Sequence, residues 1–292
     1  MAGAYRMAQG ILARDTEVRM LPKVGATIAI GVLVMSSIGG CRTGSSGARS
    51  NESIFELVAP PTPAEAAEMA SDPFNPDRRQ TGMLLLANAP FGGESVYIRL
   101  YEVALEDEDT GVQTVGVKAL GLHGSPRHVA PIGEKLASGE DPVLRWEAAR
   151  SLQRLHEPEA AIPALLEAMS TDDEADVRAA CATALGQYAQ PRVFDALVAA
   201  LDDPSLNVNL AAQGALGVLT GQRLGSTPTP WLDWADSTSD LFADRGDYEY
   251  PVFQRDRRLA EWIVPWLDPP NETPAAPAGM AGEARRGGVD EG

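Results

Sequence analysis

The feature that most constrains this chain is a repeat of about thirty residues between Tyr97 and Gly225. Four leucines mark equivalent positions, each preceded by alanine or serine: Leu120, Leu152, Leu185 and Leu216. The intervals between these leucines are 32, 33 and 31 residues. A period this regular indicates a repeat architecture, in which each unit packs mainly against its neighbours.

Each copy divides into two segments with helical periodicity. The first segments lie at 97–107, 130–139, 161–170 and 194–203, and the second at 112–124, 144–156, 177–189 and 208–220. Apolar residues recur at three- and four-residue spacing, which is typical of helices with one buried face. Acidic residues between the two segments favour a helix start, and a proline marks the passage to the next copy. We therefore predict an all-α fold, an α-solenoid of about four to five stacked helical hairpins.

These copies resemble HEAT repeats in the short form found in phycobilisome-lyase-like proteins. The resemblance is carried by Asp176-Val177-Arg178, more loosely by residues 141–145, and by Ala-Leu-Gly at 119–121, 184–186 and 215–217. It implies HEAT-like hairpins and says little about activity. Tetratricopeptide and ankyrin arrays have similar periods, but their signature motifs are absent from this sequence.

The charge balance bears on partners. The chain has 24 Lys and Arg against 41 Asp and Glu, a formal net charge of −17. Because such a surface repels phosphate backbones, we expect no nucleic-acid partner.

The N-terminus has the pattern of a secretory signal. Lys23 precedes an apolar run from Val24 to Ile38, and the run ends in small residues before Cys41. The sequence Ile-Gly-Gly-Cys resembles a bacterial lipobox, which implies cleavage before Cys41 and lipid attachment to its thiol. An uncleaved anchor is the alternative, although the run is shorter than the ~20 residues of a spanning helix. Translation begins at Met1 or at Met20. The expected location is the cell envelope, on the periplasmic side.

Composition divides the chain further. We expect a signal peptide at 1–40, a flexible tether at 41–61 and a HEAT-like solenoid at 62–225, with 62–93 as a degenerate first repeat. A cap with tryptophans and an amphipathic helix is expected at 226–267, and a disordered tail at 268–292.

Several residues are candidates for protein binding. Arg145, Arg178 and Asn209 share one position at the start of the second segment, with Gln113 as their equivalent. They serve either as structural links to an acidic turn or as a polar ladder that receives a partner. Trp146 is either packed against a neighbouring loop or a binding hot spot. Trp262 and Trp266 lie on the apolar face of the C-terminal helix, which either closes the solenoid, binds a partner or lies on a membrane.

We find no catalytic constellation. HEAT-type deoxyhypusine hydroxylases hold iron with several His-Glu pairs, whereas this chain has one such pair, His156-Glu157. We expect no metal and no cofactor, and we interpret Cys181 as a small buried core residue. The predicted function is a non-catalytic scaffold for an unidentified protein partner, attached to the membrane by a lipid. The alternatives are a lyase-like or oxygenase-like enzyme or cofactor carrier, and a structural envelope protein that self-associates.

Overall fold

The computed structural model describes residues 61–252 and 272–280. Within these residues the chain forms eleven α-helices and a short 3₁₀ turn, η1 (Pro126–His128). The helices are α2 (Pro63–Ala70), α3 (Pro76–Ala87), α4 (Ser95–Ala104), α5 (Thr110–His123), α6 (Val129–Ser138), α7 (Pro142–Leu152), α8 (Pro158–Thr171), α9 (Ala175–Leu185), α10 (Pro191–Ala200), α11 (Leu206–Thr220) and α12 (Pro228–Ser237).

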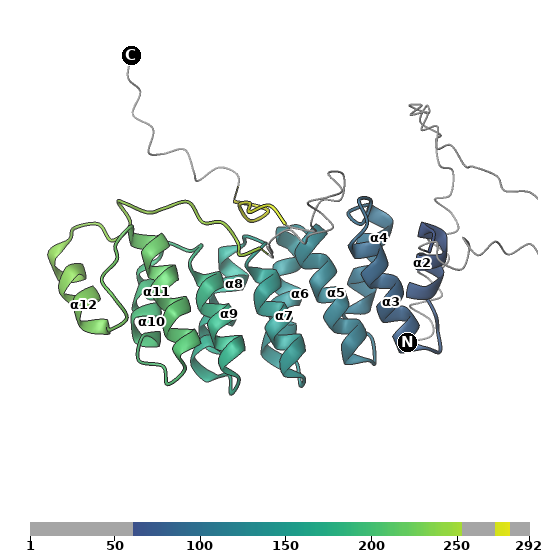
Figure 1. Ribbon diagram of the computed structural model, residues 1–292, viewed down its shortest axis with the longest axis horizontal. Helices are drawn as coiled ribbons and strands as arrows, with labels where there is room; N and C mark the ends of the chain where they lie inside the picture. The colour runs from purple at the N-terminus through teal and green to yellow at the C-terminus, as the bar shows by residue number, and fades with distance from the viewer. Residues whose placement is uncertain (1–60, 253–271, 281–292) are drawn as a thin grey trace, which may run out of the picture.

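The helices stack in pairs along one axis. Five pairs, α2/α3, α4/α5, α6/α7, α8/α9 and α10/α11, follow one another in chain order, and α12 lies at the far end (Figure 1). The second helices of successive pairs contact one another throughout, α3 with α5, α5 with α7, α7 with α9 and α9 with α11. This translational order confirms the predicted α-solenoid.

Local sequence explains where the helices begin. The side chains of Asp109 and Asp141 accept hydrogen bonds from backbone N–H groups at the starts of α5 and α7, as the acidic turns predicted. Thr62 and Glu65 form a reciprocal capping box at the start of α2. Proline occupies the first turn of α7, α8 and α10, where its missing N–H costs no hydrogen bond.

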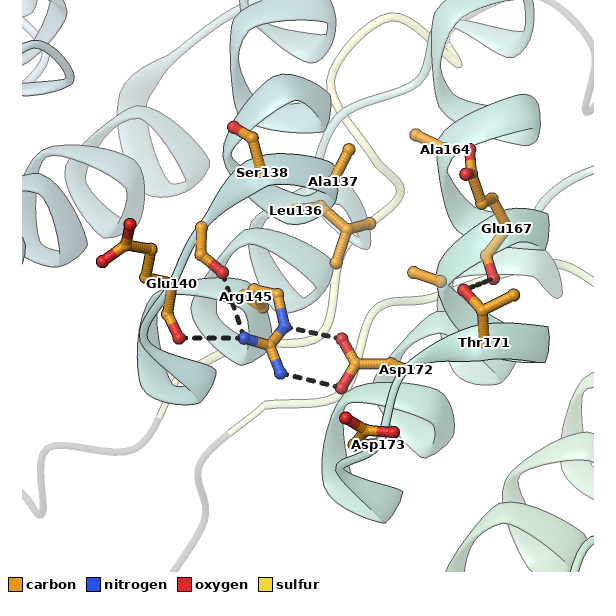
Figure 2. A pocket seen from close by; sticks show the side chains of 12 residues that line it. Leu136, Ala137, Ser138, Glu140, Arg145, Ala164, Glu167, Thr171, Asp172 and Asp173 are labelled. Atoms are coloured by element: carbon orange, nitrogen blue, oxygen red, sulfur yellow. Dashed lines mark hydrogen bonds and ion pairs between the residues drawn. The ribbon is translucent and has the colours of Figure 1, made fainter.

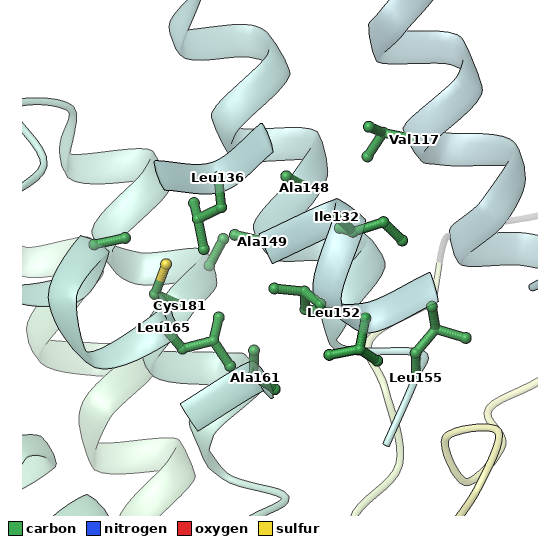
Figure 3. Close-up of a cluster of buried hydrophobic side chains, with 14 of the residues drawn as sticks. Val117, Ile132, Leu136, Ala148, Ala149, Leu152, Leu155, Ala161, Leu165 and Cys181 are labelled. Atoms are coloured by element: carbon green, nitrogen blue, oxygen red, sulfur yellow. The ribbon is translucent and has the colours of Figure 1, made fainter. Parts of the chain in front are cut away.

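The core runs without interruption along the stack. Leu120, Leu152, Leu185 and Leu216, the residues that revealed the repeat, are all fully buried. Figure 3 shows one layer of this core, where residues of α5 to α9 such as Ile132, Leu152 and Leu165 meet. Cys181 is buried in the same layer, and burial raises the pKa of its thiol, so it is a packing residue.

A second set of contacts between repeats is polar and partly or fully buried. In each one, a side chain of one second helix, or of the residues that follow it, contacts a backbone carbonyl of a neighbouring repeat. The pairs are His123 Nε2 with Ala87 O at 2.6 Å, Ser151 Oγ with Val117 O at 3.1 Å, Gln153 Nε2 with Ala180 O at 3.0 Å, and Gln187 Nε2 with Leu152 O at 2.9 Å. Ala87 and Leu152 are the last residues of α3 and α7, so these two contacts satisfy carbonyl groups that lack partners within their own helix, whereas Val117 and Ala180 lie inside α5 and α9.

The last helix covers the end of the stack. Trp231 of α12 is fully buried, and its indole Nε1 donates to Gly225 O at 2.9 Å. The ring of Trp234 lies 6.3 Å from that of Phe194 in α10. The two indoles therefore shield the apolar end of the last repeat from water.

Residues 272–280 depart from the expectation of a disordered tail at 268–292. This segment lies against the loop after α7, where Ala278 forms a parallel bridge with Leu155 (Figure 1). Pro277 and Met280 of the segment are buried. A composition rich in proline, alanine and glycine predicted disorder, but specific contacts with the solenoid order these nine residues.

A pair of glycine substitutions tests the close approach of the second helices. A Cβ at Gly121 of α5 would lie 2.9 Å from the Ser151 Cα of α7, whereas a Cβ at Gly214 of α11 would meet nothing within 4 Å. We expect Gly121→Ala to lower the free energy of unfolding by about 1–3 kcal/mol through overpacking. Gly214→Ala should raise it by about 0.5–1 kcal/mol, because alanine is the better helix former.

Urea unfolding followed by circular dichroism measures both changes. Equal effects of the two substitutions would contradict the close packing of α5 on α7.

Candidate protein-binding surface

Arginine side chains near the starts of several second helices bind an aspartate in the turn of the next repeat. We call this arrangement the arginine clamp. Arg145 of α7 donates from Nε and Nη2 to the two carboxylate oxygens of Asp172, at 2.7 and 3.0 Å (Figure 2). Its Nη1 donates to the carbonyls of Gly139 and Glu140 in its own turn, at 3.0 and 3.2 Å. Four of the five guanidinium N–H donors are thus used inside the protein.

The same clamp recurs one repeat on. Arg178 of α9 contacts both carboxylate oxygens of Asp203, at 2.8 and 3.0 Å, and the carbonyls of Asp172 and Asp173. Each aspartate also accepts from a backbone N–H two residues later in its own turn, Glu174 for Asp172 and Ser205 for Asp203. One carboxylate therefore fixes its own turn and receives the arginine of the preceding repeat.

The same clamp exists at the start of the solenoid, where the sequence alone did not reveal the pair of residues that forms it. Arg79 of α3 contacts both carboxylate oxygens of Asp107, at 2.9 and 2.7 Å, and the carbonyl of Asp72. The side chains of Arg79 and Asp107 are only 9% and 0% exposed. The signal was present in the arginine that follows Asp77-Arg78, but the irregular first repeat hid its register.

The members of this position that lack the arginine still form local links. Gln113 donates to Asp107 O at 2.6 Å, within its own turn. The following repeat has Gly139 where the others have the clamp aspartate, so the arginine and its acceptor are missing together. Asn209 of α11 donates to Leu201 O and, at 3.0 Å, to Ser226 O after the last repeat.

Arg145, Arg178 and Asn209 therefore provide structural links. This is the first of the two interpretations of their shared position. Their hydrogen bonds with the turns leave few donors for an external partner.

Beside Arg145 the surface opens into a cleft of about 430 Å³ between the end of α6 and α8 (Figure 2). The cleft includes the exposed acidic residues Glu140, Glu167 and Asp173.

Trp146 lies on a partly exposed face of α7. Its side chain is partly buried and packs against the core, and the Arg150 guanidinium lies 4.8 Å from its ring centroid. Val143, one turn earlier on the same face, is 56% exposed. Val143, Trp146 and Arg150 thus form an apolar and cationic line along α7, which we call the α7 line. The equivalent position of α11 carries Leu210, which is 54% exposed.

The remaining predicted residues are outside the described part of the chain. Cys41, Trp262 and Trp266 belong to 1–60 and 253–271, so lipidation and the C-terminal helix stay predictions. Across residues 61–252 and 272–280, no helix has the length and apolar character required to span a bilayer. In the same ranges His, Cys, Asp and Glu side chains form no group of three suited to a metal.

The clamp predicts a particular dependence of stability on pH. The hydrogen bond from Arg178 holds the pKa of Asp203 below its ordinary value of 3.8. A carboxyl whose pKa is lower in the folded state stabilises that state above the unfolded pKa, and this contribution is lost as the pH falls through the folded pKa. We expect Asp203→Asn to cost about 1–2 kcal/mol at pH 7, and we expect this cost to shrink once the pH falls below 3.8 and through the lower folded pKa of Asp203.

Urea unfolding at pH 7 and at a series of pH values from about 4 down to about 2 measures this difference, with Asp195→Asn, an exposed position of α10, as the control. A cost of Asp203→Asn that does not change with pH would show that the carboxylate charge is not what stabilises the turn.

Comparison with known proteins places the repeats in a family. No curated protein has a matching sequence. Among solved structures, the X-ray structure of YibA from Escherichia coli is similar, with 22% sequence identity and a TM-score of 0.45. The match covers 60% of this chain and 63% of that one, so it spans less than two thirds of YibA. Residues 99–180 and 162–229 match the family of HEAT repeats. The stacked hairpins between residues 99 and 229 are therefore HEAT repeats.

Proposed function

We propose that this protein is a non-catalytic scaffold that binds another protein and is anchored in the cell envelope as a lipoprotein. The binding surface is the partly exposed face of the second helices that is centred on the α7 line of Val143, Trp146 and Arg150. Solenoids present such extended faces for partners and need no cleft of their own for this purpose. The partner is a protein, and the acidic chain, with its net charge of −17, disfavours nucleic acid.

The proposal of this binding surface rests on one observation, the environment of Trp146. A tryptophan that is half covered by its own core, with an arginine over its ring, combines the two residue types most enriched in binding hot spots. The exposed Val143 on α7 adds to this surface, and the exposed Leu210 lies further along the stack on α11, so a partner that spans several repeats would cover both. The clamp arginines are bound within the stack, so they position this face and leave contact with the partner to other residues.

The anchor is supported by the sequence of the N-terminus. The apolar run from Val24 to Ile38 and the small residues before Cys41 have the order of a lipoprotein signal. Lipid on Cys41 would hold the protein at the periplasmic face of a membrane, and residues after Cys41 rich in glycine and serine would separate it from the bilayer.

Substitution of Trp146 tests the binding surface. We expect Trp146→Ala to reduce capture of the partner from solubilised envelopes at least about tenfold, because truncation removes a hot-spot side chain. Asp195→Ala, at an exposed position of the first helix α10 and so outside the second helices, is the control and should capture as well as the native chain. Quantitative mass spectrometry of the captured proteins measures both. Identical capture by both variants would exclude Trp146 from the interface.

Substitution of Cys41 tests the anchor separately. The native protein should begin at Cys41 and carry acyl groups, as measured by mass spectrometry of its N-terminal peptide. Cys41→Ala should lack the acyl groups and leave the membrane fraction. An unmodified Cys41 within a longer N-terminal peptide would refute lipidation and leave the HEAT-repeat scaffold in place.

A further inference from the structure

The segment 272–280 binds to the solenoid as an extended peptide. Ala278 N donates to Arg154 O, and His156 N donates to Ala278 O, both at 2.8 Å. These two bonds flank Leu155 and form the parallel bridge between Leu155 and Ala278. The loop after α7 therefore offers a short backbone edge, and the segment adds to it as a strand adds to a sheet.

Side chains fix the direction of the segment. At its start, Glu272 pairs with Arg154 of the loop after α7, at 2.6 Å. The Arg154 guanidinium also lies 4.7 Å from the ring centroid of Tyr250, whose backbone N–H donates to Ala275 O at 3.2 Å. At its end, Met280 is buried. An acidic residue and a buried apolar residue eight positions later thus hold the two ends.

Gly279 makes the fit specific. Its backbone has φ of +100°, a conformation that side-chain-bearing residues rarely adopt. A Cβ at this position would also lie 2.5 Å from Pro126 Cγ and 2.7 Å from His156 O. The groove between η1 and the loop after α7 accepts glycine here and excludes larger residues.

The charge around Arg154 matches an acidic ligand. Burial raises the pKa of Glu147, whereas the nearby cations Arg150, Lys118 and Arg154 lower it, and Glu272 raises it. Three cations gathered around two carboxylates make this a basic region on an acidic protein. The carboxylate of Glu272 offsets one of these positive charges.

We propose that this edge is a peptide-binding groove and that residues 272–280 are its ligand within the same chain. The groove is built from Arg154, Leu155, His156 and Pro126. It takes an extended peptide with an acidic residue, followed seven residues later by glycine and then by an apolar residue. The contacts of the segment are those of a bound peptide, with a few backbone hydrogen bonds, one ion pair and two buried side chains. A segment held in this way opens more readily than the helices beneath it.

Hydrogen exchange on the full-length protein tests whether the segment is a separable ligand. Gly279→Val should release the segment, so the amide of His156, which donates to Ala278, should exchange at least about tenfold faster. The amide of Leu185 within α9 should not change. Ala276→Val, at an exposed position of the same segment, is the matched control and should leave both amides unchanged.

A synthetic peptide with the sequence of residues 271–281 then tests binding in trans. Added to full-length Gly279→Val, it should restore the slow exchange of the His156 amide. The same peptide with Glu272→Lys should require at least about tenfold higher concentration, because the lysine would face Arg154.

A second variant, full-length Glu272→Lys, controls for the possibility that valine at position 279 changes the exchange of His156 by distorting the backbone nearby. It should also speed exchange at His156 and be corrected by the native peptide. Slow exchange at His156 in both variants, or failure of the native peptide to restore it in either, would overturn the proposal.

Discussion

Each helical hairpin of this protein can bury its apolar face only against the next hairpin, and this constraint decides the rest of the structure. The two helices of a hairpin approach closely at Gly116, where an added Cβ would lie 2.8 Å from Ala104 Cβ of α4. The later copies carry small buried residues at the same position, Ala148, Cys181 and Ala212. The four leucines that define the repeat, Leu120, Leu152, Leu185 and Leu216, are buried between the helices. Hydrophobic burial supplies most of the stability of such a stack, but burial alone has no direction and does not fix the spacing between neighbours.

Polar contacts fix that spacing at two levels. At the turns, an arginine side chain forms an ion pair with an aspartate of the next repeat, as seen for Arg79, Arg145 and Arg178. Deeper in the stack, side chains such as Ser151 and Gln187 donate to carbonyls of a neighbouring repeat. Because these groups are already paired, we seek the functional surface elsewhere within residues 61–252 and 272–280. The partly exposed α7 line and the groove occupied by residues 272–280 are our two candidates.

The sequence allowed the helical hairpins, their register and the solenoid to be predicted, because one buried leucine per copy makes the period visible. It also showed Arg145 and Arg178 at one position and offered a link to an acidic turn as one of two interpretations. It did not identify the individual partners Asp172 and Asp203, which are 27 and 25 residues away. Residues 272–280 were missed for a related reason. Their order arises from contacts with Arg154, 118 residues earlier, and local composition carries no record of such contacts. Trp146 could be identified as a candidate, whereas its half-buried packing required the structure.

The clamp between repeats is tested most directly by a double-mutant cycle on Arg145 and Asp172, with Arg145→Gln, Asp172→Asn and the double variant unfolded in urea at neutral pH. Side chains of Arg145 and Asp172 are 17% and 5% exposed, so their interaction is only weakly screened by solvent. We expect the two side chains to be coupled by about 1–3 kcal/mol, with the double variant clearly more stable than the sum of the single losses implies. Additive losses would mean that the clamp does not hold neighbouring repeats together.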